Sequence, residues 1–100
     1  MQNYTVNISP ESLEDIINIS NYIHKKSRNK FISTKIYNLL ISTCNSLEIL
    51  PQIYQIQFDE VRRISIKSYN IFYEILEYKK EIIIYRILWS SQDYSKISFK

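Results

Sequence analysis

The sequence predicts an α+β domain with a short N-terminal strand, an antiparallel helix hairpin, and then a mainly antiparallel sheet of three to four strands. Two observations predict it. Apolar residues recur at helical spacing in two consecutive segments of the first half of the chain. Three runs rich in β-branched and aromatic residues follow in the second half. The hairpin has a shared apolar side that needs a cover, and the sheet supplies it. The length of 100 residues predicts a single domain, residues 1–100.

A short strand and a first helix open the chain. Residues 4–8 alternate apolar and polar side chains, as a half-buried strand does. Ser9 can cap the free backbone N–H groups of a following helix, and Pro10 suits the first helical position. The apolar face of this helix is expected to comprise Leu13, Ile16, Ile17, Ser20 and Ile23. The helix should end near residues 27–29.

The second helix shows the strongest periodicity in the chain. Its apolar residues are spaced three and four apart over nearly five turns, and they are Ile32, Ile36, Leu39, Leu40, Thr43, Leu47 and Leu50. Pro51 prevents the helix from continuing, because proline has no N–H and its ring clashes with the preceding turn.

The strands follow in the second half. Residues 53–58 alternate weakly and are either a short strand or a loop. In the strand over 61–67, Arg62 shares a side with Ile64, whereas Arg63 and Lys67 point the other way. Strands over 69–78 and 82–90 are joined through residues 79–81. The unbroken Ile82, Ile83 and Ile84 predict an interior strand covered on both faces at that end. Tyr69 and Tyr73, which share a side with Ile71 and Ile75, are predicted to face the core.

The composition excludes several kinds of site. Glycine is absent, so glycine-rich phosphate loops are excluded and tight turns must use Asn, Asp, Ser or Lys. Cys44 is alone, which predicts a packing role, and His24 is the single histidine. No metal site and no cofactor are therefore expected. The chain has no run of about 18 apolar residues and no signal-peptide pattern, so a cytoplasmic protein without membrane contact is expected.

The net charge is +3 with a pI near 9.0, which is compatible with a nucleic-acid partner without proving one. Part of the positive charge gathers around the helix junction, at Lys25, Lys26, Arg28, Lys30 and Lys35. The favoured interpretation of this group is a solvated connection. The other group lies in the strand region.

Five short motifs occur in an order that resembles the RelE/ParE superfamily of bacterial toxins. They are Ser9-Pro10-Glu11, Leu50-Pro51, Val61-Arg62, Tyr69-Asn70-Ile71-Phe72-Tyr73, and Arg86-Ile87-Leu88-Trp89 followed by a polar end with Asp93 and Tyr94. The resemblance covers nearly the whole chain and implies the toxin component of a type II toxin–antitoxin system. It also implies a cognate antitoxin protein as partner.

Three functions are compatible with this resemblance. The first is a ParE-like toxin that binds and inhibits a cellular target such as DNA gyrase. The second is a RelE-like, ribosome-dependent endonuclease that cuts ribosome-bound mRNA. The third is an inactive homologue that still binds the antitoxin. The first is favoured because two positions depart from the pattern of the nucleases: Asn70 stands where they place an arginine, and Trp89 where many members place a histidine.

The resemblance also suggests site residues. Arg63 corresponds to a site lysine of family enzymes that lack histidine, and Tyr94 to their C-terminal proton donor. Candidate target-binding residues are Arg62, Lys67, Asn70, Arg86 and Trp89. Each has a structural alternative. Arg62 could pair with Glu14 or Asp15, Arg86 could form a structural ion pair or contact the antitoxin, Trp89 could pack, and Tyr94 could be an exposed chain-end residue.

Overall fold

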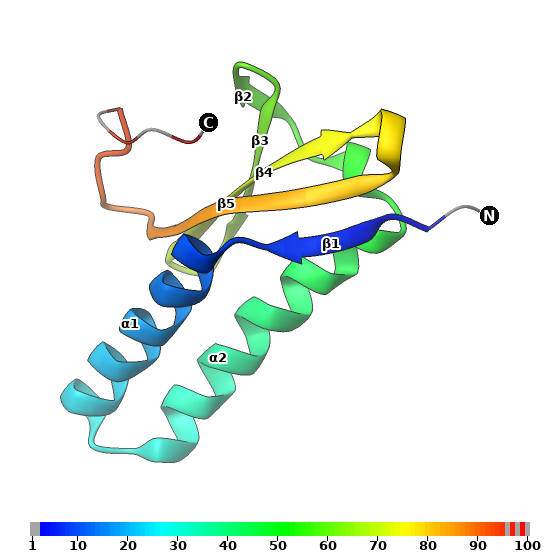
Figure 1. The fold of residues 1–100 in the computed structure, drawn as a ribbon. Coiled ribbons are helices and arrows are strands. Elements are labelled where there is room, and N and C mark those ends of the chain that lie inside the picture. Colours follow the sequence, from blue (N-terminus) through cyan, green and yellow to red (C-terminus); the bar gives the residue numbers. More distant parts are fainter. Residues whose placement is uncertain (1–2, 96, 98, 100) are drawn as a thin grey trace.

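The computed structural model describes residues 3–95, 97 and 99. It consists of a helix hairpin packed on one face of a five-stranded sheet (Figure 1). The helices are α1 (Pro10–Ser27) and α2 (Lys30–Asn45), and the strands are β1 (Thr5–Ile8), β2 (Ile56–Phe58), β3 (Val61–Ile66), β4 (Tyr69–Leu76) and β5 (Glu81–Trp89). Short 3₁₀ helices cover Ser46–Glu48, Pro51–Ile53 and Glu77–Lys79.

The sheet has the order β1-β5-β4-β3-β2, in which β1 runs parallel to β5 and the other neighbours are antiparallel. The predicted fold class is thus confirmed, with four strands after the hairpin and β1 added at the far edge. β5 is an interior strand as expected. Ile82 and Ile84 are fully buried, whereas Ile83 is only half-buried, so the face away from the helices is less well covered at that end.

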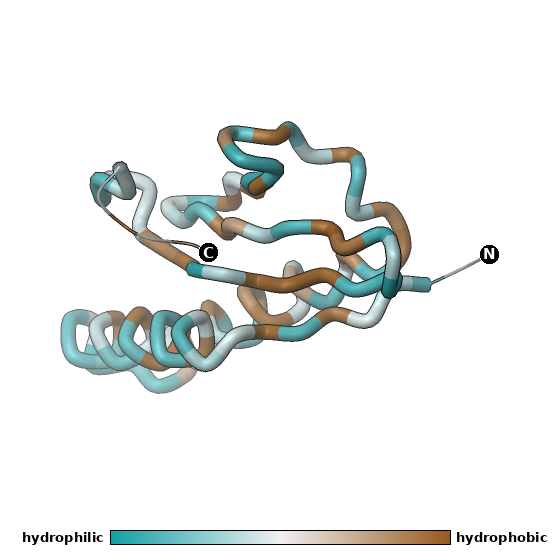
Figure 2. Tube along the Cα trace, turned by 45° about the horizontal axis from the view of Figure 1, so that its top comes forward, coloured by the Kyte–Doolittle hydropathy of each residue, from teal (hydrophilic) through white to brown (hydrophobic). Residues whose placement is uncertain are grey.

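The main core lies between the helices and the sheet. Both helices alternate apolar and polar residues along their length (Figure 2). Ile16 and Ile19 of α1 and Leu40 of α2 are buried against Ile71 and Tyr73 of the sheet. The predicted core position of Tyr69 and Tyr73 is therefore confirmed. Cys44 is also fully buried there, and burial raises the pKa of its thiol to about 12, which fits a packing role.

Two helix predictions were wrong in detail. The buried face of α1 includes Ser12, Ile16 and Ile19, whereas Leu13 is 41% and Ile17 is 50% exposed. The helix is rotated because Ser12 donates a hydrogen bond to the carbonyl of Ile84 (3.0 Å) and so must face the sheet. The second helix ends at Asn45 and continues as a 3₁₀ helix, because Leu47 turns into the core while Leu50 stays 60% exposed.

The turns show how the chain folds without glycine. Positive φ angles occur at Arg28 (53°), Asp59 (45°), Glu60 (68°), Lys67 (51°) and Lys80 (50°). Asp and Lys were expected at such positions, but Arg and Glu were not. Each of these residues costs about 1 kcal/mol relative to an unstrained backbone. The chain tolerates that cost because strand pairing and helix packing fix both ends of every turn.

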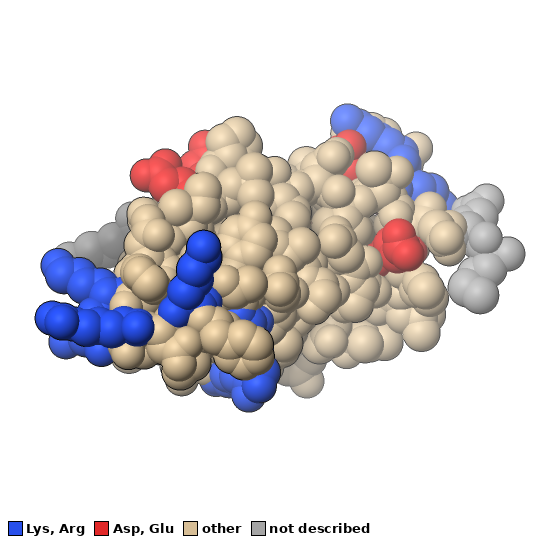
Figure 3. Space-filling model, turned by 90° about the horizontal axis from the view of Figure 1, so that it is seen from below, with Lys and Arg blue, Asp and Glu red and all other residues tan. Residues whose placement is uncertain are grey.

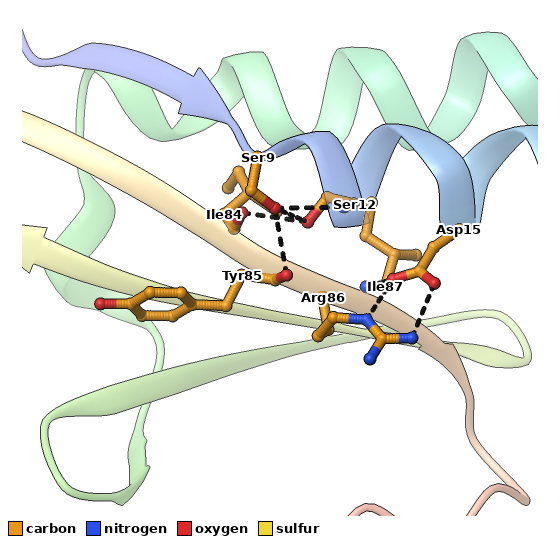
Figure 4. A network of polar contacts seen from close by, with 7 residues as sticks. All are labelled: Ser9, Ser12, Asp15, Ile84, Tyr85, Arg86 and Ile87. Atoms are coloured by element: carbon orange, nitrogen blue, oxygen red, sulfur yellow. Dashed lines mark hydrogen bonds and ion pairs between the residues drawn. The ribbon is translucent and has the colours of Figure 1, made fainter. Parts of the chain in front are cut away.

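A polar network joins the start of α1 to β5 (Figure 4). Ser9 caps α1 by accepting a hydrogen bond from the N–H of Ser12 (3.1 Å), and its hydroxyl donates to the carbonyl of Tyr85 (3.1 Å). The carboxylate of Asp15 accepts two hydrogen bonds from Arg86, at 2.7 and 2.9 Å, and one from the N–H of Ile87 at 2.9 Å. The first turns of α1 are thereby fixed to an interior strand.

Asp15→Ala should lower the free energy of unfolding by about 2–3 kcal/mol, because it leaves a half-buried guanidinium and a backbone N–H without their partner. Urea unfolding followed by circular dichroism measures this change. Glu14→Ala is the matched control, since Glu14 is the neighbouring exposed carboxylate, and it should change stability by less than about 0.5 kcal/mol. Equal effects of the two variants would contradict a specific role for Asp15.

Candidate functional site

The candidate site lies on the sheet face opposite the helices. Because side chains alternate along a strand, Ile64 and Ile66 of β3 join the helix-side core, and Arg63 points to the other side. A second, smaller core forms on this open face from Val61, Phe72 and Leu88. Ring side chains pack around it, namely those of Phe58, Tyr85, Tyr94 and Phe99.

The segment after β5 returns over the open face and brings Tyr94 to Arg63. The guanidinium of Arg63 donates a hydrogen bond to the Tyr94 hydroxyl at 3.5 Å. The ring of Tyr94 lies against Phe72, with 4.8 Å between centroids, and stacks on Phe58 at 6.1 Å. Tyr94 is therefore half-buried, and its alternative interpretation as an exposed chain-end residue is wrong.

A cleft of about 540 Å³ opens beside this contact. Phe58, Asp59, Val61, Tyr94 and Phe99 are among the residues that line it. Of the seven residues that line it, three are aromatic and two are aliphatic. A cleft of this kind accommodates an apolar or planar group more readily than a highly charged one.

The other candidate residues do not join Arg63 and Tyr94. Arg62 does not pair with Glu14 or Asp15. Its guanidinium instead donates to the carbonyls of Gln52 (3.1 Å) and Tyr54 (2.5 Å), in the segment that precedes β2. Arg86 forms the ion pair with Asp15, and its structural alternative is thereby confirmed.

Asn70, Trp89 and Lys67 are also separate from the Arg63–Tyr94 contact. Asn70 is 5% exposed and accepts a hydrogen bond from Ser65 (3.0 Å). Trp89 packs between Tyr22 (5.4 Å) and Tyr69 (5.0 Å), which is the packing alternative. Lys67 occupies the β3–β4 turn and lies near α2, where it lines a shallow depression with Lys35.

Sequence reasoning missed a further polar pair on the open side. Tyr85 donates a hydrogen bond to the carboxylate of Glu74 at 2.6 Å. Burial and then the neighbouring carboxylate raise the pKa of Tyr85, so its hydroxyl stays protonated at neutral pH. Alternation along β4 places Glu74 on the same side as Phe72. Tyr85 lies on the open side because it alternates with the helix-side Ile84, a signal present in the sequence, and it is the extra residue of a β-bulge between β4 and β5.

No group of three His, Cys, Asp or Glu side chains that could hold a metal ion occurs in the described part of the chain. Nor is any helix of residues 3–95 long and apolar enough to span a membrane.

A family model of the ParE toxin of the type II toxin–antitoxin system parDE matches residues 6–94. The chain belongs to this family of ParE toxins. The match runs from Val6 in β1 to Tyr94, so it includes both the hairpin and the strands of the open sheet face. No curated protein matches the chain in sequence.

Solved structures show the same fold at low sequence identity. The toxin–antitoxin complex RelBE2 from Mycobacterium tuberculosis contains a chain 15% identical, with a TM-score of 0.64 over 87% of this chain and 98% of that one. A mutant of the E. coli toxin RelE in the free state is 10% identical, with a TM-score of 0.59 over 90% of this chain and 86% of that one. The intact E. coli RelBE complex gives 11% identity and a TM-score of 0.52, over 89% and 99% respectively. These likenesses show that the chain has the fold of the RelE toxins.

Phe58→Ala should loosen the segment that carries Tyr94, because it removes ring contacts with Phe72, Tyr94 and Phe99. Limited digestion with chymotrypsin should then cut at Tyr94 at least about fivefold faster, which corresponds to a local loss of about 1 kcal/mol. Phe31→Ala is the control, since that ring is 76% exposed. An unchanged rate in Phe58→Ala would show that Phe58 does not hold the segment.

Proposed function

We propose that this ParE-family toxin acts by binding and inhibiting a cellular target such as DNA gyrase, without cutting RNA. The proposal rests on the observation that the cationic candidate residues do not gather at one point. Cleavage of RNA through its 2′-hydroxyl requires a base, an acid and cations that stabilise the charge on the phosphorane. Arg62 is turned toward backbone carbonyls and Arg86 is held by Asp15. Among the described candidates, Arg63 is the one cation that reaches the open face beside Tyr94.

The two departures from the nuclease pattern point the same way. Asn70 is buried on the sheet and bonded to Ser65, so it cannot replace an arginine at a phosphate. Trp89 is packed with Tyr69 on the helix side and supplies no acid or base. The cleft beside Tyr94, lined by three aromatic and two aliphatic residues, suits a protein side chain from a target better than a polyanion, because aromatic residues are enriched among the anchors of protein–protein interfaces.

A RelE-like, ribosome-dependent mRNA endonuclease is the second candidate. The contact between Arg63 and Tyr94 favours it, since a guanidinium beside a phenol provides one cation and one proton donor at the same point. The ribosome would then have to position the message, which compensates for a sparse active site.

We further propose a cognate antitoxin as the partner of this chain. The solved RelBE2 and RelBE neighbours are toxin–antitoxin complexes. On this chain Leu13 and Ile17 form an exposed apolar strip on α1, which a partner segment can cover by groove packing. β1 and β2, at the two edges of the sheet, are alternatives for strand addition.

Purified protein should inhibit supercoiling by DNA gyrase while leaving mRNA on programmed ribosomes intact. Supercoiling gels and primer extension measure the two activities side by side. The proposal predicts that Arg63→Ala and Tyr94→Phe do not create or remove any cleavage.

Ribosome-dependent cleavage would contradict the proposal and establish the alternative. In that case Arg63→Ala should lower the cleavage rate by about 100-fold or more. Tyr78→Phe is the matched control for Tyr94→Phe, because Tyr78 is 82% exposed, and it should cleave normally. Inhibition of neither process would contradict both candidates and leave an inactive antitoxin-binding homologue.

Co-expression with the protein encoded next to the toxin should yield a stoichiometric complex after affinity purification. Ile17→Glu should weaken that complex by about tenfold or more, because it places a charge on the exposed apolar strip. Tyr78→Glu, at an exposed position away from α1, is the control. A neighbour that never co-purifies would argue against the antitoxin proposal.

A further inference from the structure

The positive charge of this chain is concentrated at one end of the molecule. Between Asp15 and Glu48 the sequence contains no aspartate or glutamate, yet this segment holds five Lys and Arg residues. The remaining eight Lys and Arg residues stand against all ten acidic residues, so the rest of the chain is net negative by two. The hairpin surface, defined as Lys25, Lys26, Arg28, Lys30 and Lys35, lies at the end of the hairpin that points away from the sheet (Figures 1 and 3).

These five cations have no anionic partners within the described structure. The ion pairs formed there are Lys79–Glu81, Lys80–Glu77 and Arg86–Asp15. The first two lie where β4 connects to β5, and the third lies near the N-terminal end of α1, away from the hairpin surface. All five side chains belong to exposed residues. Like charges at this density repel one another within a Debye length of about 8–10 Å. A bound polyanion relieves that repulsion, whereas a helix connection without a ligand gains no stability from five neighbouring cations.

A cleft of about 350 Å³ lies between the helices at this end. Its lining is polar, with Asn21, His24 and Thr34 beside Lys30 and the ring of Tyr37. Amide, hydroxyl and imidazole groups donate hydrogen bonds to phosphate and sugar oxygens. The volume reaches the range of sites that hold a single small ligand, and therefore suits one nucleotide unit. The ring of Phe31, 76% exposed, stands at the start of α2 and offers a face for an unpaired base.

We propose that the hairpin surface binds the phosphate backbone of a nucleic acid. The shared chemistry of DNA and RNA backbones is what it recognises, since the cations and polar donors contact charge and not base edges. An anionic membrane is the less suitable polyanion, because every side chain that lines the cleft carries a hydrogen-bonding group and none is a purely aliphatic chain that would insert among acyl chains. The surface is separate from Arg63 and Tyr94, so it is independent of which target the toxin inhibits.

The test measures binding of the purified full chain to labelled single-stranded RNA, single-stranded DNA and duplex DNA by fluorescence anisotropy. The salt concentration is varied from about 50 to about 200 mM, because phosphate contacts weaken steeply over this range. The wild-type chain should bind at least one of these probes, with an affinity that falls steeply as salt rises. K25Q/K26Q should weaken binding by about tenfold at low salt and reduce the salt slope by about 2.

The matched control is K79Q/K80Q, which removes the same charge from the β4–β5 turn and should leave binding within about twofold of wild type. Circular dichroism verifies that both variants fold, and Gln preserves the helical propensity of the replaced lysines. Three outcomes would overturn the proposal. They are no binding to any of the probes, equal losses in both variants (which would show an effect of net charge alone), or binding to phosphatidylserine vesicles at least as tight as binding to the nucleic-acid probes.

Discussion

The structure depends on the way the first turns of α1 complete the edge of β5. β1 pairs with β5 only from Glu81 to Ile84, so the outer edge of β5 beyond Ile84 has no strand beside it. Backbone groups on that edge still need partners, because an unpaired buried N–H or C=O costs about as much as a lost hydrogen bond. Ser9, Ser12 and Asp15, spaced three residues apart on one side of the helix, bind the Tyr85 carbonyl, the Ile84 carbonyl and the Ile87 N–H. The side chains at the start of α1 therefore supply the hydrogen bonds that a neighbouring strand would make to this edge.

The same joint determines what each face of the sheet presents. The pairing of β4 with β5 shifts by one residue between Phe72 and Tyr73, so Tyr85 is an extra residue. Before the shift Ile82 and Ile84 face the helices, and after it Ile87 does. The shift turns Ile87 toward the helices and Leu88 toward the open face, and the Arg86 side chain reaches α1, where Asp15 binds it. A charged residue in an apolar strand is thereby removed from the candidate site and used to hold the hairpin against the sheet.

The sequence was sufficient for the order of elements, the cap at Ser9 and the inward side of β4, because these follow from local periodicity and backbone chemistry. It could not give the rotation of α1, since Leu13 and Ile17 are as apolar as Ile16 and only the bond from Ser12 to β5 decides which side faces in. It offered Arg62 as an alternative partner of Asp15 and expected an ion pair for Arg86 without naming its partner. Arg62 and Arg86 both lie in strands, and which of them meets α1 depends on the strand order, a long-range property. Arg63 and Tyr94 were named from the family resemblance, but their contact at 3.5 Å requires the return of the C-terminal segment, which no pattern in residues 90–95 indicates.

The two surfaces of this toxin are chemically different and lie on different elements. The open sheet face joins one guanidinium to a group of aromatic rings, an arrangement better suited to protein side chains than to a polyanion. The hairpin surface carries five of the thirteen Lys and Arg residues, lies in a segment without acidic residues, and has the exposed apolar side chains of Phe31 and Ile32 beside it. A protein that works at an enzyme acting on DNA, or at a ribosome, meets a polypeptide surface and a nucleic-acid backbone together. Placing the two kinds of contact on separate elements lets each be optimised without the desolvation cost of burying lysines beside aromatic rings. The rigid joint between α1 and β5 then fixes the distance between them.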